Sequence, residues 1–347
     1  MAIKEQGAQQ SPARPVIANV EPSAAITGGE LHIRGEHLAA ADGLATVRLG
    51  NQKAHLIVAG DSYIIARVPD SAIVGEVQVM AGGALSATHE THLGIQIAES
   101  LHPVASPAVD REGNVYTTFS GSRGHKAPVS IYKTDTSYNT RPFVTDLMNA
   151  TGLAFDRDGI LYASSRHDGI IYQITPGGNM SVYAEGMGVA TGIAFDRDEN
   201  LYVGDRSGTV FKISRARQIY VFATLEPSIA AYHLAFGPED YLYVTGPTTS
   251  SFDAVHRISK AGEVEMYYRG LGRPQGMAFD ADGRLYVAGS IAGRRGILRF
   301  GVDRKPEQFL SGPSIVGLAF TPSRAMVVTT QNALFRVDVG IAGWPLI

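Results

Sequence analysis

One histidine, His233, stands out among the residues that could carry chemistry. It begins one copy of a repeated segment, at a position where the three most similar copies have glycine. A side chain there must project toward the centre of the fold or displace a neighbouring strand. Imidazole is a suitable general base near neutral pH, and Asp205 or Tyr232 could orient it, so these three are the candidate catalytic residues. The alternative is a histidine that fills the interior and is hydrogen-bonded to the backbone.

A second group of candidates is polar and suits ligand binding. Arg166, Arg206 and Arg294 fall on loops of the repeats. Guanidinium groups bind carboxylates and phosphates in bidentate fashion, so these arginines could form an anion-binding rim. Ordinary loop salt bridges, from Arg206 to Asp205 or Asp168, are the alternative. The other residues that we predict to face a ligand are His167, Thr151, Thr191 and Gln275.

The sequence contains six copies of one segment, and the fold that this repeat forms must position the candidate catalytic and ligand-binding residues. Residues 152–162 read Gly-Leu-Ala-Phe-Asp-Arg-Asp-Gly-Ile-Leu-Tyr. The copies lie 40–46 residues apart and begin at Ser106, Gly152, Gly192, His233, Gly276 and Gly317. This period is typical of a propeller blade with four strands.

Each copy predicts a meander of four strands that runs from the centre of the ring outward. One face, which we call the wide face, collects the loops before each innermost strand and between the second and third strands. The acidic turns lie on the opposite, narrow face. The last copy lacks an outer strand after residues 333–339, and residues 95–100 match the pattern of one. We predict that these two segments pair and close the ring.

Before the repeats, residues 15–92 contain short β-type runs separated by turns. This pattern favours an antiparallel sandwich. His89-Glu90-Thr91-His92 resembles a zinc motif, but its histidines are three residues apart rather than four. We interpret it as a solvated linker. The expected strands are residues 16–20, 30–35, 46–49, 55–58, 63–68 and 76–81.

Two parts of the chain resemble known families. Pro15-Val16-Ile17, Val20-Glu21-Pro22-Ser23 and the Gly-Gly-Glu-Leu-His-Ile-Arg-Gly-Glu-His-Leu run at 28–38 resemble the IPT/TIG immunoglobulin-like domain. That resemblance implies a non-catalytic module for spacing, docking or dimerisation. The Gly-Ile-Ala-Phe-Asp-x-x-Gly-x-Leu-Tyr-Val pattern resembles the six-bladed propellers of the NHL-repeat and SMP-30/gluconolactonase-like type. This superfamily includes enzymes and binding scaffolds.

The metal-dependent lactonases of this superfamily hold a divalent cation with a glutamate, asparagines and an aspartate at the starts of inner strands. A hard cation needs such oxygen ligands. At the matching positions this chain has Ala105, Thr151, Thr191 and Gln275, with no carboxylate. We therefore expect no metal and no other cofactor, although a hydrolase that uses Asp205 could still bind a cation such as Ca²⁺.

Composition narrows the partners and leaves the compartment open. The formal net charge is −3, so no long-range field favours nucleic acid, and we expect none as a partner. No run is apolar enough to span a bilayer, and residues 1–14 lack the apolar core of a signal peptide. The default location is cytoplasmic, or secreted or periplasmic if a signal was removed.

Together these features predict an all-β chain. We expect a flexible arm at 1–14, an IPT/TIG Ig-like sandwich at 15–92, and a six-bladed β-propeller at 93–347 closed by an N-terminal outer strand. The expected function is a scaffold that binds a small molecule or a protein partner at the wide face. Its Ig-like module would dock, or mediate self-association. The alternative is an SMP-30/gluconolactonase-like hydrolase, of lactonase or esterase type, with a degenerate metal site.

Overall fold

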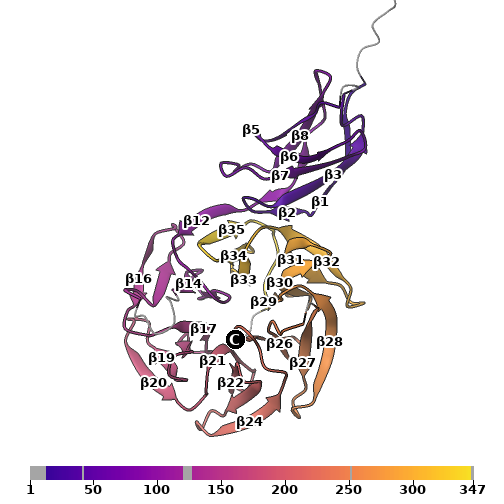
Figure 1. Cartoon of the computed structure of the whole chain (residues 1–347). Coiled ribbons are helices and arrows are strands. Elements are labelled where there is room, and N and C mark those ends of the chain that lie inside the picture. Colours follow the sequence, from indigo (N-terminus) through magenta and orange to yellow (C-terminus); the bar gives the residue numbers. More distant parts are fainter. Residues whose placement is uncertain (1–12, 41–42, 120–126, 251, 345–347) are drawn as a thin grey trace, which may run out of the picture. The chain divides into compact units, whose positions relative to one another are not determined.

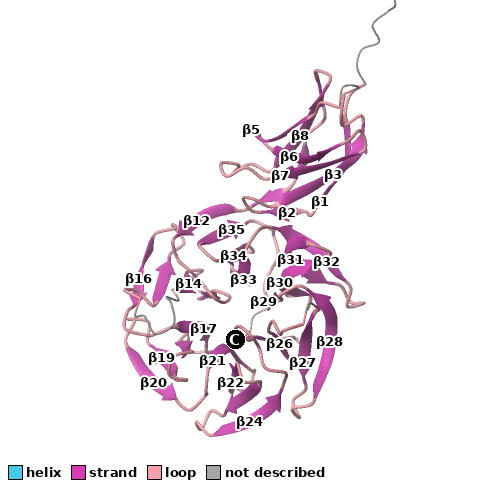
Figure 2. Cartoon of the chain, viewed as in Figure 1, coloured by secondary structure: helices cyan, strands magenta, loops and turns pink. Residues whose placement is uncertain are grey.

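A computed structural model describes residues 13–40, 43–119, 127–250 and 252–344. The chain divides into two compact units, Met1–Leu93 and Gly94–Ile347. Every regular element in the described residues is a β-strand, so none of them contains a helix that could cross a bilayer (Figure 2). The expected flexible arm falls mostly on residues 1–12, and a wide-face loop of the first repeat falls on 121–126. Both lie outside the described residues.

The first unit contains two antiparallel sheets, with strand orders β1-β3-β7-β6 and β10-β8-β4-β5, and β9 beside β8. The strands expected from the sequence all form. The segment that we interpreted as a linker differs, because His89–Glu90 pairs with β8. The bounds are β1 Val16–Glu21, β2 Ala24–Ala25, β3 Glu30–Glu36, β4 Thr46–Leu49, β5 Gln52–Lys53, β6 His55–Ala59, β7 Tyr63–Arg67, β8 Glu76–Ala81, β9 Ala84–Leu85, β10 His89–Glu90 and β11 His92–Leu93.

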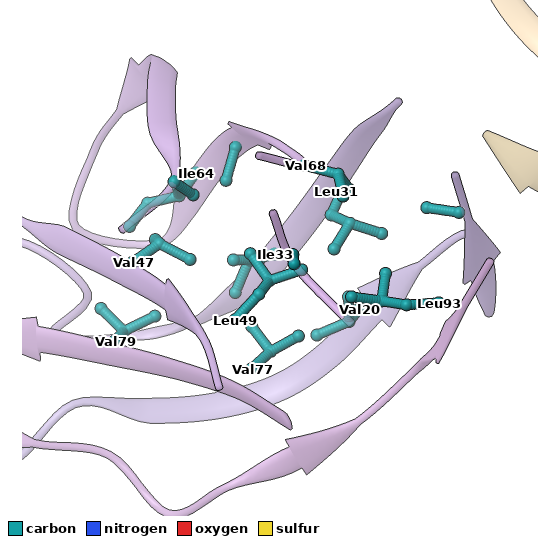
Figure 3. Close-up of a cluster of buried hydrophobic side chains, with 14 of the residues drawn as sticks. Val20, Leu31, Ile33, Val47, Leu49, Ile64, Val68, Val77, Val79 and Leu93 are labelled. Carbon is teal, nitrogen blue, oxygen red and sulfur yellow. The ribbon is translucent and has the colours of Figure 1, made fainter. Parts of the chain in front are cut away.

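The two sheets of the first unit share one apolar core (Figure 3). In β3, Leu31 and Ile33 are buried while the residues between and beside them are not, as the two-residue period of a strand requires. They pack with Val47 of β4 and Val77 of β8, which come from the other sheet. Each such side chain contributes about 1.5–3 kcal/mol by leaving water.

The second unit has the β-propeller arrangement, with four-stranded meanders placed around a ring (Figure 1). The outermost strands, such as β20 and β24, lie at its periphery. We number the blades by their strands. Blade 1 is β13 Ala108–Val109, β14 Val115–Thr118, β15 Ile131–Thr134 and β16 Thr140–Val144; blade 2 is β17 Ala150–Phe155, β18 Leu161–Ser165, β19 Ile171–Ile174 and β20 Met180–Ala184; blade 3 is β21 Ala190–Phe195, β22 Leu201–Asp205, β23 Thr209–Ile213 and β24 Ile219–Thr224.

The remaining blades follow the same order along the chain. Blade 4 is β25 His233–Phe236, β26 Leu242–Thr245, β27 Asp253–Ile258 and β28 Val264–Leu271; blade 5 is β29 Met277–Phe279, β30 Leu285–Ile291, β31 Arg294–Phe300 and β32 Pro306–Ser311; blade 6 is β33 Ile315–Phe320, β34 Met326–Thr330 and β35 Ala333–Val337, with β12 Ile95–Glu99. Strand β12 pairs antiparallel with β35, from Ile95 opposite Arg336 to Glu99 opposite Ala333.

Aromatic side chains fill the spaces between blades. The tyrosine of a second strand meets an aromatic ring from the fourth strand of its own blade and a phenylalanine from the next blade. In blade 3, Tyr202 lies 4.9 Å from the rings of both Phe222 and Phe236, edge to face. Edge-to-face pairs add about 0.5–1.5 kcal/mol beyond burial. The same three-ring contact recurs around Tyr116, Tyr162, Tyr243 and Tyr286.

The acidic turns of blades 1, 3 and 5 are hydrogen-bonded caps. In blade 3, Asp196 Oδ1 accepts the Asn200 backbone N–H at 2.8 Å, and Oδ2 accepts the Tyr202 hydroxyl at 3.1 Å. Burial, and then the nearby Asp196 charge, raise the pKa of Tyr202 well above its usual value. This bonding repeats at Asp110 and Asp280. The carboxylate therefore links the turn to the second strand of the blade. This structural role accounts for the acidic residues, so no bound cation is needed to explain them.

The last described residues cross the narrow face. The Trp344 N–H donates to the carbonyl of Phe279 in blade 5 at 2.9 Å, and Gly343 forms a bridge with Asp280. Ile341 N–H donates to the Arg324 carbonyl of blade 6 at 3.0 Å. The guanidinium of Arg197, in the blade 3 turn, lies 5.2 Å above the Trp344 ring. We call residues 340–344 the tail, and it ties three blades together.

Candidate functional site

His233 begins the innermost strand of blade 4 and is buried. Neighbouring Leu234 packs toward blade 3, against Gly204. Side chains alternate along a strand, so His233 faces the opposite way, toward blade 5, as Ala235 does. Burial lowers the pKa of His233 to about 4, so the ring is neutral at pH 7. Within the described residues, no hydrogen bond to its imidazole is found.

The two residues expected to orient His233 have other partners. Asp205 accepts the Val189 N–H at 2.9 Å and the Ser207 hydroxyl, and it is only 6% exposed. The Tyr232 hydroxyl donates to the carbonyl of Glu226, and burial raises its pKa to about 12. In the part of the chain that the structure describes, neither is hydrogen-bonded to His233. Both side chains hold wide-face loops in place.

Three predicted ligand-facing residues join backbone segments. Thr191 Oγ1 donates to Gly204 O at 2.9 Å and accepts the Tyr232 N–H at 3.1 Å, which links blades 3 and 4. Gln275 Nε2 donates to Ile315 O at 3.4 Å, from blade 5 to blade 6. Thr151 donates to Asn149 O at 3.1 Å. These hydrogen bonds give the side chains a structural role at the starts of the inner strands.

The predicted basic rim has mixed environments. Arg206 donates to the carbonyls of Ser228 at 3.5 Å and Ile229 at 3.1 Å. Its expected salt bridges, to Asp205 or Asp168, are not found among the described residues. Arg166 is partly buried, whereas His167 and Arg294 are exposed. Arg166 and Arg206 lie on wide-face loops, and Arg206 holds the loop between blades 3 and 4. The prediction that Arg294 lies on a loop was wrong, because Arg294 begins β31 and pairs with Ile291 of β30.

Close contact between innermost strands explains the glycines that begin the repeats. A Cβ on Gly192 would lie 2.5 Å from the Tyr232 carbonyl oxygen, and one on Gly276 would lie 2.6 Å from the Cα of Gly317. Distances below 3.0 Å are not tolerated by real Cβ atoms. These glycines let neighbouring blades touch at the centre. The sequence signal was present, because from the second copy to the sixth His233 alone interrupts the glycines.

The donor set on the wide face does not fit a divalent cation. The Thr191 hydroxyl is used between blades, and the Asp205 carboxylate is bonded to Val189 and Ser207. A hard cation needs several free oxygens that converge on one point. Among the described residues, no group of three or more His, Cys, Asp or Glu side chains is arranged to hold a metal.

Two cavities open on the narrow face, where sequence reasoning expected no site. One, of about 190 Å³, lies between blades 3 and 4 and includes Lys212 and Lys260. The other, of about 380 Å³, lies between blades 6 and 1. Blade 6 has Val327 where other blades have the tyrosine of the three-ring contact, and β12 supplies Ile97 in place of an aromatic ring. The substitution of aliphatic for aromatic residues could have revealed this second cavity.

Comparison with solved structures shows which fold this is. A gluconolactonase from Xanthomonas campestris is 14% identical, with a TM-score of 0.60, and the match covers 71% of this chain and 89% of that one. An auxiliary nutrient-binding protein from Bacteroides thetaiotaomicron is 10% identical, with a TM-score of 0.55, over 95% of this chain and 99% of that one. A virginiamycin B lyase from Staphylococcus aureus, in a catalytically inactive form with quinupristin, is 12% identical, with a TM-score of 0.51, over 95% of this chain and 96% of that one.

These likenesses are to enzymes and to binding proteins alike. At such low identity they show a shared fold, the β-propeller of gluconolactonase-like and virginiamycin B lyase proteins. No family model matches the sequence, and no curated protein matches it.

Proposed function

We propose that the chain is a binding scaffold whose propeller holds a small polar molecule at the wide face, beside His233. In this proposal the propeller has six blades and is closed by β12, and the first unit is an Ig-like docking module. The pairing of β12 with β35 supports the closed ring. The two packed sheets of the first unit support the Ig-like assignment.

The observation that carries the binding role is the environment of His233. Its ring is buried, neutral and without a hydrogen bond in the described residues, while Asp205 and Tyr232 are committed elsewhere. A neutral imidazole offers one donor and one acceptor. A bound hydroxyl or amide that hydrogen-bonds to both ring nitrogens would therefore gain affinity. With a pKa near 4 and no carboxylate partner, the same ring is a poor general base.

A lactonase is the second candidate, and the likeness to a gluconolactonase fold favours it. In that case His233 would take a proton from water, with an ion or a second residue brought into place by the substrate. The hydrogen bonds at Thr191 and Asp205 would have to break for an ion to bind there.

One experiment separates the two candidates. The protein, labelled with ¹⁵N-histidine, is titrated with a panel of neutral sugars and with glucono-1,5-lactone, and hydrolysis is followed in parallel. If the protein is a scaffold, at least one neutral sugar or the lactone should shift the NMR signals of the His233 ring. Binding of that compound should be lost in His233→Ala. The lactone should be hydrolysed no faster than in buffer alone. The control His55→Ala changes an exposed histidine of the first unit and should bind like the wild type.

The opposite outcome would favour the enzyme. After dialysis with Ca²⁺, Mn²⁺ or Zn²⁺, a stoichiometric bound ion together with lactone hydrolysis that His233→Ala abolishes would rule out the scaffold. Self-association is tested separately, by measuring the oligomeric state at several protein concentrations. A docking module that dimerises would make that state depend on concentration, and removal of residues 1–92 should abolish the dependence.

A further inference from the structure

The cavity between blades 3 and 4 contains a cation that lacks the partner its counterparts have. Lys212 lies opposite Tyr202 in the sheet, with its ammonium 5.5 Å from the ring centre. Basic residues occupy the same place in other blades, and each has a carboxylate nearby. Lys133 pairs with Asp110 at 3.7 Å, Arg257 with Glu239 and Glu265, and Arg299 with Glu307 at 2.5 Å. Among the described residues, Lys212 has no ion pair.

The register of the sheets explains the difference from blades 4 and 5. The residue across from Arg257 on the fourth strand is Glu265, and the residue across from Arg299 is Glu307. In blade 3 the residue across from Lys212 is Tyr220, whose hydroxyl bonds to Gln218 at 2.6 Å. A tyrosine therefore stands where blades 4 and 5 place a carboxylate. The ammonium of Lys212 is left to face the cavity.

The acids that line the same cavity have partners of their own or face water, although neutral hydrogen-bond donors leave the charge of Asp196 in place. The Asp196 carboxylate accepts hydrogen bonds from Asn200 and Tyr202, and Asp240 lies between Arg197 and Lys260, at 3.2 Å from each. Asp198 also lines the cavity, but it is exposed, where water screens its charge. Lys212 is thus the cation of this cavity that an incoming anion would neutralise.

Other groups in the cavity suit an oxyanion. Ser259 Oγ accepts the Glu263 N–H at 3.2 Å, which leaves its own O–H for a second acceptor. Lys260 adds a second ammonium at the lining. The volume of about 190 Å³ equals that of about six water molecules in the liquid, at roughly 30 Å³ each. An anion of the size of phosphate, or a short carboxylate, fits that space.

We propose that the cavity between blades 3 and 4 binds a small oxyanion, a phosphate group or a short carboxylate, through Lys212, with Ser259 and Lys260 as further donors. The site lies on the narrow face, so it is separate from the one proposed beside His233 and does not depend on it. Hydrogen bonds to a charged group are among the stronger ones in proteins, and Lys is an effective phosphate ligand.

The test is a titration of the full chain with inorganic phosphate and, separately, with acetate, at constant ionic strength set with chloride. The lysine side chains are ¹³C-dimethylated, and NMR follows their signals, with Lys212 assigned from its loss in Lys212→Met. We expect phosphate or acetate to shift the Lys212 signal saturably. The anion that shifts it at lower concentration identifies the group that the site prefers.

Two variants and one control make the test decisive. Tyr220→Glu places the carboxylate of blades 4 and 5 opposite Lys212, at a residue that is half exposed, so the fold should not suffer. Because this carboxylate would form an ion pair with the Lys212 ammonium, anion binding should weaken at least about tenfold. Lys212→Met should weaken anion binding by the same factor, and titration calorimetry measures its affinity. Lys133→Met changes the paired lysine of blade 1 and should bind like the wild type. Anion binding unchanged in both Tyr220→Glu and Lys212→Met, or no saturable shift in the wild type, would overturn the proposal.

Discussion

At the scale of single residues, the buried imidazole of His233 is the feature around which the proposed function is built. It sits where the most similar repeats have glycine, it is 5% exposed, and its ring carries no charge at pH 7. A group like this couples folding to pH. The unfolded chain takes up a proton at its ordinary pKa of about 6.5, whereas the folded chain resists protonation until about pH 4.

The first prediction concerns this pH dependence. Since the folded pKa is the lower one, the stability due to neutral His233 is complete above pH 6.5 and is lost as the pH falls toward 4. The loss is about 3 kcal/mol. Urea unfolding of wild type and His233→Gln at about pH 7 and pH 4.5 should show that the variant loses most of this slope.

The control for that measurement is His167→Gln, which changes an exposed histidine. Burial also lowers the pKa of His256, and that contribution stays in all three proteins. If His233→Gln kept the full decrease in stability across this pH range, the ring would not be the buried neutral group described.

Sequence reasoning found His233 but could not find the partners of its neighbours. Thr191 and Gln275 were expected to face a ligand because their positions match ligand positions in related propellers. Their hydrogen bonds to the next blade depend on how closely two blades approach. A repeat pattern in the sequence does not give that distance. Asp205 was expected beside His233, but its carboxylate accepts hydrogen bonds from Ser207 on its own loop and from Val189 in the segment before β21.

At the scale of elements, the contacts between adjacent innermost strands determine which substitutions the inner strands tolerate. The period and the strand positions could be read from the sequence, because apolar runs recur in each blade and acidic turns recur in most of them. The cavity between blades 3 and 4 could not, since it depends on which residues lie opposite one another in the sheet. Lys212 shows this, because only the strand register reveals that Tyr220 replaces a glutamate.

The second prediction tests the contact between blades 3 and 4. Gly192→Ala adds a methyl group that would lie 2.5 Å from the Tyr232 carbonyl oxygen, so the two inner strands must separate. We expect a loss of about 1–3 kcal/mol, measured by urea unfolding. Gly177→Ala is the control, because its added methyl would meet only ordinary contacts at 3.7 Å or more. Equal stability of the two variants would contradict close contact at the centre.

At the scale of the whole molecule, the first and last strands of the second unit form one sheet. Strand β12 covers the edge of β35, which would otherwise expose unpaired backbone groups. Its Ile97 and Ala98 also pack against a core that contains Val327 and Leu334. The sequence made this pairing predictable, because the last repeat visibly lacks a strand.

The third prediction removes β12 but keeps the chain length. Replacing residues 95–99 by a Gly/Ser segment should cost about 3 kcal/mol and lower Tm by on the order of 10 °C, because a ladder and part of a core are lost. Differential scanning calorimetry measures it. The control replaces the exposed turn at 302–305, where Val302 is fully exposed, and should leave Tm nearly unchanged. A β12 replacement that melts like the wild type would mean that the ring does not need this strand.

The tail has a consequence for the motion of the blades. Its Trp344 reaches back to blade 5 and to Arg197 of blade 3, so these contacts join segments that are far apart in the sequence. Blades 5 and 6 cannot separate at the narrow face unless the backbone hydrogen bonds of Ile341 and Trp344 break first. The rate at which these two amides exchange with deuterated solvent would therefore report how often this face of the ring opens.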